Sequence, residues 1–305
     1  MKRNLLLLTA SAAAFLFASC AKTESAAPAG DNPDPSGRVA VQFTGSTLDI
    51  EPASAATRSE SPWTQKGTIG IHVLGETTTD IMDGYANVGY TFNGGSQSAF
   101  SPDDETIYFP VDGSKRRFAA YFPYKELEGT TYKVDLTQQP TLSDQAAFEL
   151  LWTGVTEAYD KTQPQVALNF DHQYAKITIT VENGTGIEKE DLVQMTVAMT
   201  DMHLTGDFDV VTGTMKQTGD AGDLTFWRNS DGSGQYALVM PTEAGAGRRV
   251  NFTLGGDTFR WAIPEKTFAA GQTYDYTVRV NRTELGFTAT ISEWEEGESG
   301  SGVAE

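Results

Sequence analysis

Short segments in which apolar and polar residues alternate recur along this chain from residue 39 to residue 291. Period-two alternation is typical of a half-buried β-strand, because successive side chains of a strand point to opposite faces. The clearest examples are residues 39–45, 67–74, 117–124, 176–181 and 274–280. Helical periodicity is almost absent, and pairs such as Asn-Gly, Asp-Gly and Gly-Gly mark turns between segments. The pattern predicts an all-β fold built of β-sandwiches.

The alternation stops near residue 173 and restarts at residues 176–181. Each half holds about seven expected strands, a number that one sandwich can contain. A chain of 305 residues is long enough for about two domains. We therefore expect two tandem β-sandwich domains, at residues 39–173 and 174–294. The acidic, Gly/Ser-rich end at 295–305 is expected to be a disordered tail.

The N-terminus has the features of a secretory signal at residues 1–19. Lys2 and Arg3 precede a short apolar run, and small residues stand before Cys20, the only cysteine of the chain. The letters FASC resemble the bacterial lipobox, although Phe17 stands where Leu is usual. We expect a lipidated Cys20, followed by a flexible spacer to residue 38 that is rich in Ala, Pro and Ser. A plain signal peptide with an incidental cysteine is the alternative.

The first alternating segment is joined to the rest of the chain by a linker of small residues. Val39, Val41 and Phe43 share one face of this expected strand, and the linker runs from Pro52 to Arg58. A linker of this composition packs no core and is exposed to proteases. The segment is therefore either an ordinary first strand followed by a loop, or a strand that proteolysis removes.

Composition and motifs argue against several functions. The net charge of −19 opposes nucleic-acid binding, which needs a basic surface. The three histidines stand in separate segments without metal-ligand spacing, and no hydrolase or nucleotide-binding motif is present. We therefore predict no catalytic, metal or cofactor site, and a protein that is not an enzyme.

Two histidines differ in their expected surroundings. His72 falls on the polar face of its segment and is expected to be an exposed or edge histidine, whereas His172 is expected to be a hydrogen-bonded structural residue. Trp261 alternates with apolar neighbours and is expected in the core. Trp227 follows Phe226 in a polar region and is the best candidate for an exposed aromatic that stacks on a sugar.

Several phrases of the sequence, in this order and spacing, resemble the fimbrillin (Mfa-like) lipoproteins, which are subunits of type V pili. The resemblance covers residues 20–294, and its phrases are FTG at 43–45, GTIGI at 67–71, IYFP at 107–110, FAAYFPY at 118–124, LNFDH at 168–172, FAAGQTY at 268–274 and ISEW at 291–294. It implies two β-sandwiches of transthyretin-like topology. It also implies export as a palmitate-bearing lipoprotein of the outer membrane surface, and a mature protein in the fimbrium.

The resemblance further implies assembly by donor-strand exchange. An arginine-specific protease would cut the bond between Arg58 and Ser59 and release the strand with Val39, Val41 and Phe43. A strand of another pilus subunit would then take its place. The expected partners are other pilus subunits, that protease and, through the lipid anchor, the outer membrane. A host or bacterial surface receptor is a further possible partner that the resemblance does not identify. An unprocessed loop arginine is the alternative for Arg58.

The C-terminus departs from the pattern of a stalk subunit, because Val303 is the only aliphatic residue after Trp294 apart from Ala304. Either residues 287–294 form the strand that is donated, or the subunit accepts a strand and donates none, as a tip or accessory subunit would. A cell-surface lipoprotein that binds glycans is the alternative function, and a glycosidase is the third.

Overall fold

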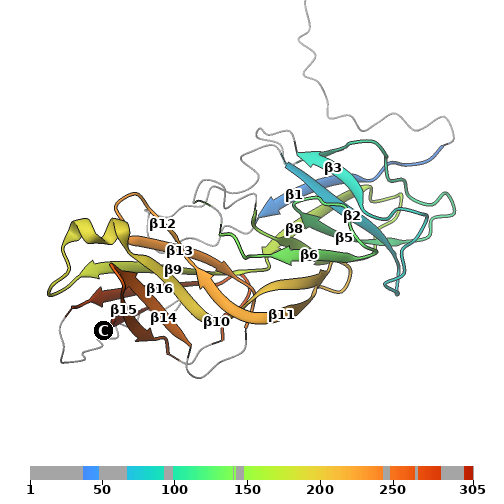
Figure 1. The fold of residues 1–305 in the computed structure, drawn as a ribbon. Helices are drawn as coiled ribbons and strands as arrows, with labels where there is room; N and C mark the ends of the chain where they lie inside the picture. Colours follow the sequence, from blue (N-terminus) through green and yellow to red (C-terminus); the bar gives the residue numbers. More distant parts are fainter. Residues whose placement is uncertain are drawn as a thin grey trace, which may run out of the picture. The chain divides into compact units, whose positions relative to one another are not determined.

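The computed structural model describes residues 37–47, 67–92, 99–139, 141, 148–242, 248–264, 267–282 and 299–304. Over these residues the chain consists of strands joined by turns and loops, with one short 3-10 helix, η2 (Lys189–Gln194) (Figure 1). The prediction of an all-β fold with β-sandwich architecture is confirmed.

The first sheet has seven strands in the order β1-β8-β7-β5-β2-β3-β4. One face of this sheet is buried in a core rich in aromatic residues. In β8, for example, Val166, Leu168 and Phe170 are buried and alternate with exposed neighbours. An isolated bridge between Thr44 and Ala99 brings β1, at one edge of the sheet, beside the start of β4 at the other edge. The first strand therefore closes the sheet. The strands are β1 (Gln42–Thr47), β2 (Gly67–Gly75), β3 (Val88–Phe92), β4 (Phe100–Pro102), β5 (Arg116–Phe122), β7 (Leu151–Val155) and β8 (Gln165–His172).

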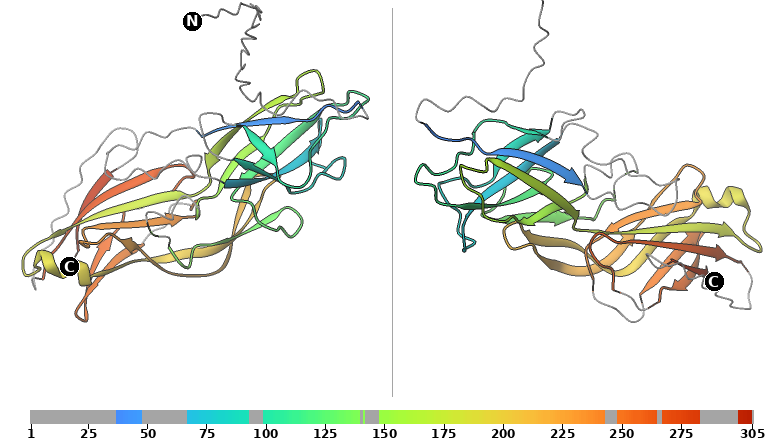
Figure 2. Two further views of the ribbon diagram at one scale, coloured as in Figure 1. Left: turned by 90° about the horizontal axis from the view of Figure 1, so that it is seen from above. Right: turned by 180° about the vertical axis from the view of Figure 1, so that it is seen from behind.

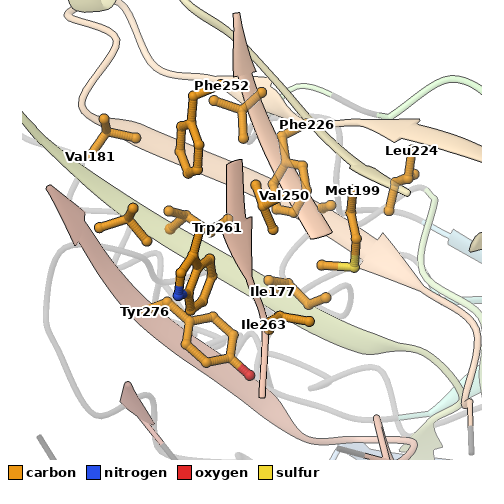
Figure 3. Packing of buried hydrophobic residues seen from close by; sticks show 14 of the residues in the cluster. Ile177, Val181, Met199, Leu224, Phe226, Val250, Phe252, Trp261, Ile263 and Tyr276 are labelled. Carbon is orange, nitrogen blue, oxygen red and sulfur yellow. The ribbon is translucent and has the colours of Figure 1, made fainter. Parts of the chain in front are cut away.

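The second half of the chain forms two sheets that enclose a second core. One sheet has the order β11-β10-β14-β15, and the other β12-β13-β9-β16-β17. Figure 3 shows Ile177, Trp261 and Tyr276 pointing into the space between them. Trp261 lies 5.1 Å from Tyr276 between ring centroids, so its predicted core position is confirmed. The strands are β9 (Ala175–Asn183), β10 (Thr196–Asp209), β11 (Thr214–Thr225), β12 (Trp227–Arg228), β13 (Gly234–Val239), β14 (Arg249–Leu254), β15 (Asp257–Ala262), β16 (Thr273–Val280) and β17 (Ser299–Ala304).

One long hairpin, β10–β11, serves both halves. The first part of β10 pairs with β14, and its second part pairs with β6 (Thr131–Asp135), which comes from the first half of the chain. A third core cluster combines Ala119 and Tyr121 of β5 with Phe208 of β10 and Met240, which follows β13. The assignment of residues 39–173 to a sandwich of their own therefore fails at β6, because that strand completes the sheet of β10.

The chain end also differs from the expectation of a disordered tail at 295–305. Ser299–Ala304 form β17, which runs parallel to β16 at the edge of its sheet. Strand pairing uses backbone N–H and C=O groups, so a Gly/Ser-rich segment without apolar alternation can still extend a sheet.

Candidate functional site

The first strand is hydrogen-bonded to the protein along both of its edges. On one edge β1 runs parallel to β8, with Gln42 opposite Gln165 and Thr47 opposite Phe170, and the two lie side by side in Figure 2. On the other edge, the N–H of Val41 donates to the carbonyl of Ile107 at 2.9 Å, and the N–H of Phe109 donates to the carbonyl of Val39 at 2.9 Å. We call β1 with these two flanks, β8 and residues 107–109, the β1 site.

The side chains of the first strand complete the first core. Val41 is 5% exposed and Phe43 is 1% exposed. The ring of Phe43 meets the rings of Tyr90 at 5.1 Å and Phe118 at 5.2 Å, both edge to face. Removing a buried phenylalanine side chain of this kind costs about 3–5 kcal/mol of stability. The predicted inward positions of Val41 and Phe43 agree with this burial, whereas Val39 is only partly buried and contributes its backbone carbonyl.

Two further residues shape the β1 site. A Cβ placed on Gly45 would lie 2.4 Å from the ring of Phe100, so only glycine lets β1 approach this close to the start of β4. The hydroxyl of Tyr90 accepts a hydrogen bond from the N–H of Ile107 at 2.8 Å, which fixes the flank opposite β8. Burial of Tyr90 raises the pKa of its hydroxyl to about 12, so the group stays protonated at neutral pH. The place of Tyr90 in this site was not predicted from the sequence, although Tyr90 is in phase with Val88 and Phe92 along β3.

The remaining predicted site residues lie outside the described residues. This holds for Cys20, Arg58 and Ser59, since residues 1–36 and 48–66 are not described. Residues 48–66 join the end of β1 to the start of β2. The lipidation site and the cleavage site therefore remain predictions from the sequence.

The histidines have structural surroundings that differ from one another. His72 is fully buried, so the expectation of an exposed residue was wrong: the second face of β2 is covered as well as the first. His172 lies at the end of β8, where its Nδ1 is 2.7 Å from Oε2 of Glu149. Burial alone would lower the pKa of His172, but the hydrogen bond and charge of Glu149 outweigh it and raise the pKa.

Other possible sites carry ordinary structural contacts. The carboxylate of Asp231 accepts the N–H and O–H of Ser233, which makes this serine a turn residue. Lys133 pairs with Asp207 at 3.0 Å on a strand face. Over the described part of the chain, no cluster of three or more His, Cys, Asp or Glu side chains could hold a metal ion. Over the same part, no helix combines the length and apolarity needed to cross a membrane.

Comparison with known proteins agrees with this architecture. A model of the fimbrillin-like family matches residues 56–294. A relative from Bacteroides uniformis, provisionally named fimbrium subunit Fim1C, is 32% identical over 258 residues, which span 79% of this chain and 82% of the relative.

Solved structures give the same result. The crystal structure of a provisionally assigned cell adhesion protein from Bacteroides uniformis has a TM-score of 0.65 and 30% identity, covering 80% of this chain and 94% of that one. One from Bacteroides ovatus has a TM-score of 0.63 at 18% identity, covering 86% and 98%, and supports the fold alone. The family match extends over more than half of the chain, and the relatives are fimbrial and adhesion proteins rather than enzymes. The chain therefore belongs to the fimbrillin-like family and is a fimbrial protein of that family.

Proposed function

We propose that this fimbrial subunit is assembled by exchange of its first strand. Cleavage after Arg58 releases β1, and a strand from another subunit fills the β1 site. The observation that carries the proposal is the placement of β1. It is hydrogen-bonded along both edges and inserts Phe43 into the core, yet only residues 48–66, which include the small-residue linker from Pro52 to Arg58, join it to β2.

The free energy of burial favours a β1 site that is always occupied by a strand. Burial of Val41 and of Phe43 contributes about 1.5–3 kcal/mol each. If β1 were absent, backbone groups of β8 and of residues 107–109 would lose their hydrogen-bond partners. Each group left unpaired in a buried position would cost about 1–3 kcal/mol of stability. While β1 is tethered, its high effective concentration keeps competing strands out. After cleavage β1 can leave for good, and an alternating apolar strand from another chain can bind.

The C-terminal segment supports an accepting role. Ser299–Ala304 pair with β16 of the same chain, and Val303 is the only bulky apolar residue among them. A donor strand for a site such as that of β1 needs large side chains at alternating positions. We propose that the subunit accepts a strand at the β1 site and that Ser299–Ala304 are not a donor strand, as in a tip or accessory subunit; donation of residues 287–294 is the alternative.

The cleavage step is tested with the chain's own first strand as a probe. The wild type and an Arg58→Ala variant are treated with an arginine-specific protease and mixed with a labelled peptide of residues 39–47. The wild type should bind the peptide, and a peptide with Phe43→Asp should fail, since it places a charge between Tyr90 and Phe118. Arg260→Ala is the matched control, because Arg260 is an exposed residue of β15 outside the β1 site, and this variant should bind the peptide as the wild type does. Equal binding by uncut Arg58→Ala would show that the linker does not gate the site.

We further propose that Cys20 carries the lipid that holds the precursor at the outer membrane surface. Cys20→Ser should release the protein into the soluble fraction, and Cys20→Ala should behave in the same way. Retention of either variant on membranes after a high-salt wash would contradict lipid anchoring. Mass spectrometry of the mature N-terminus reports the acyl chains directly.

A further inference from the structure

The outward face of the sheet β12-β13-β9-β16 carries a row of aromatic and polar side chains, whereas the core face is apolar. Ile177 and Tyr276 point into the core (Figure 3), and Ile179 belongs to the same core cluster. Alternation along β9 and β16 therefore places Thr178 and Asp275 on the opposite face.

Four residues stand in register across this outward face. Trp227 of β12 is opposite Tyr236 of β13, Tyr236 is opposite Thr178 of β9, and Thr178 is opposite Asp275 of β16. Directly opposed residues on neighbouring strands share a face and lie within contact range. The rings of Trp227 and Tyr236 have centroids 5.5 Å apart and planes inclined by 38°. We call Trp227, Tyr236, Thr178 and Asp275 the aromatic platform.

The tyrosine of the platform leans along its strand. Its hydroxyl lies 2.7 Å from the point where a Cβ on Gly234 would be, so the space left by this glycine accommodates it. Tyr236 and Trp227 both remain partly exposed. Burial, followed by the charges of Asp231 and Asp275, raises the pKa of Tyr236.

The threonine of the platform has an unused hydrogen-bonding group. Thr178 is 9% exposed, and among the described residues its hydroxyl has no hydrogen-bond partner. Buried polar groups are normally paired, because an unpaired one costs free energy. A hydroxyl group supplied by a ligand would pair it, beside the carboxylate of Asp275 and the two aromatic rings.

We propose that the aromatic platform binds an uncharged pyranose of a glycan. Partly exposed aromatic rings offer flat apolar surface for the C–H face of a sugar ring. Thr178 and Asp275 provide a hydroxyl and a carboxylate for sugar hydroxyls. Asp231 and Asp275 repel sialic acid and sulfated sugars, since like charges at this range oppose each other. Burial lowers the pKa of Lys176 on the same face, and the charges of Glu149 and Asp275 oppose this only in part. The proposal does not depend on strand exchange, since no platform residue belongs to the β1 site.

The test uses the whole chain without its signal segment. The protein is applied to an array of neutral, sialylated and sulfated oligosaccharides, and the Kd of each hit is measured by calorimetry. Trp227→Ala should raise the Kd at least tenfold, and Thr178→Val, which keeps the shape but removes the hydroxyl, should raise it about fivefold. Arg279→Ala is the matched control, because Arg279 lies on the outward face of β16 away from the platform and pairs with Glu182 at 2.8 Å. It should leave the Kd unchanged.

Each outcome decides the proposal. The proposal is supported if the protein binds neutral glycans and if Trp227→Ala and Thr178→Val weaken this binding. Both variants must unfold at the same temperature as the wild type. No binding on the array, binding of anionic glycans only, or a Kd that neither variant changes would overturn it. Strand exchange is judged separately by the peptide of residues 39–47, so failure of one proposal leaves the other to its own test.

Discussion

The buried histidine of β2 makes stability depend on pH in a predictable direction. His72 is fully buried; the N–H of Asn87 donates to its Nδ1 at 3.3 Å, and among the described residues its Nε2 has no hydrogen-bond partner. Protonation at Nδ1 would remove the bond from Asn87 and place a charge in the core. Burial lowers the pKa of His72 to about 4, and the negative charge of Asp209 opposes this only in part.

The size of the effect follows from the two pKa values. In the unfolded chain the pKa of histidine is about 6.5, so the unfolded state binds the proton first as the pH falls. His72 therefore costs no stability at pH 7, and the loss begins below the unfolded value. Between pH 7 and pH 5 the free energy of unfolding should fall by about 2 kcal/mol through this group, and by about 3 kcal/mol at pH 4.

The measurement is urea unfolding of the wild type and of His72→Gln at pH 7 and pH 5, followed by tryptophan fluorescence. Glutamine is uncharged and keeps a polar group near Asn87. The variant should lose less stability than the wild type over this interval, by about 2 kcal/mol. Equal losses in both proteins would show that His72 titrates normally and that its burial has been overstated.

Three other predictions concern the contacts between the two halves of the chain. Gly213→Ala should destabilise the protein by about 2–4 kcal/mol in urea unfolding, because a Cβ there would lie 2.1 Å from the ring of Trp152 at a φ of +70°. Gly129→Ala is the control, because Gly129 has a similar φ of +67° and no atom lies within 4 Å of its Cβ; it should cost only about 1 kcal/mol. Equal losses of stability in the two variants would exclude the contact with the Trp152 ring as the cause. His172→Gln should destabilise more at pH 6 than at pH 9 in thermal melts, since a raised pKa gives stability that is present below the unfolded pKa and is lost as the pH rises through the folded one. A fragment of residues 174–305 should aggregate or lack a cooperative melt by circular dichroism, and a soluble fragment with a cooperative transition would show that the third cluster is dispensable.

The sequence predicted strands well where one face is buried and the other is in water. Residues 274–280 coincide with all but the first residue of β16, because their apolar residues alternate as the burial does. Prediction failed for β11, where Leu224 is the one buried residue of a polar strand held by backbone pairing to β10. It failed for His72 because both faces of β2 are covered. The neighbouring strand β5 carried the available signal: between Phe118, Ala120 and Phe122 stand Ala119 and Tyr121, which are also apolar, and strands buried on both faces read as such continuous apolar runs.

Local capping chemistry explains another difference. In the sequence Val193 alternates in phase with Met195, Val197 and Met199, yet it belongs to η2 and is 41% exposed. Glu188 and Asp191 form a reciprocal capping box that starts this helical turn. A capping box is visible in sequence when an acidic residue stands three positions after the cap. The β1 site was predicted in outline from Val41 and Phe43, but its second flank was not, because one isolated bridge, from Tyr108 to Ala40, stands there in place of a regular strand.

The separation of the cores decides whether β1 can leave without disrupting the rest of the fold. Val41 and Phe43 belong to the first core, together with residues of β2, β3, β5 and β8. The cluster that joins the two halves contains no residue of β1. It is built on the opposite face of β5, where Ala119 and Tyr121 meet the β10–β11 hairpin, and the Nε1–H of Trp152 donates to the carbonyl of Val210 at 2.7 Å. Loss of β1 would therefore expose the first core while β6, β10 and β11 still hold the two halves together. Strand exchange at the β1 site then requires no separation of the halves, which is the condition for a subunit to be opened by a protease and remain folded until a partner's strand arrives.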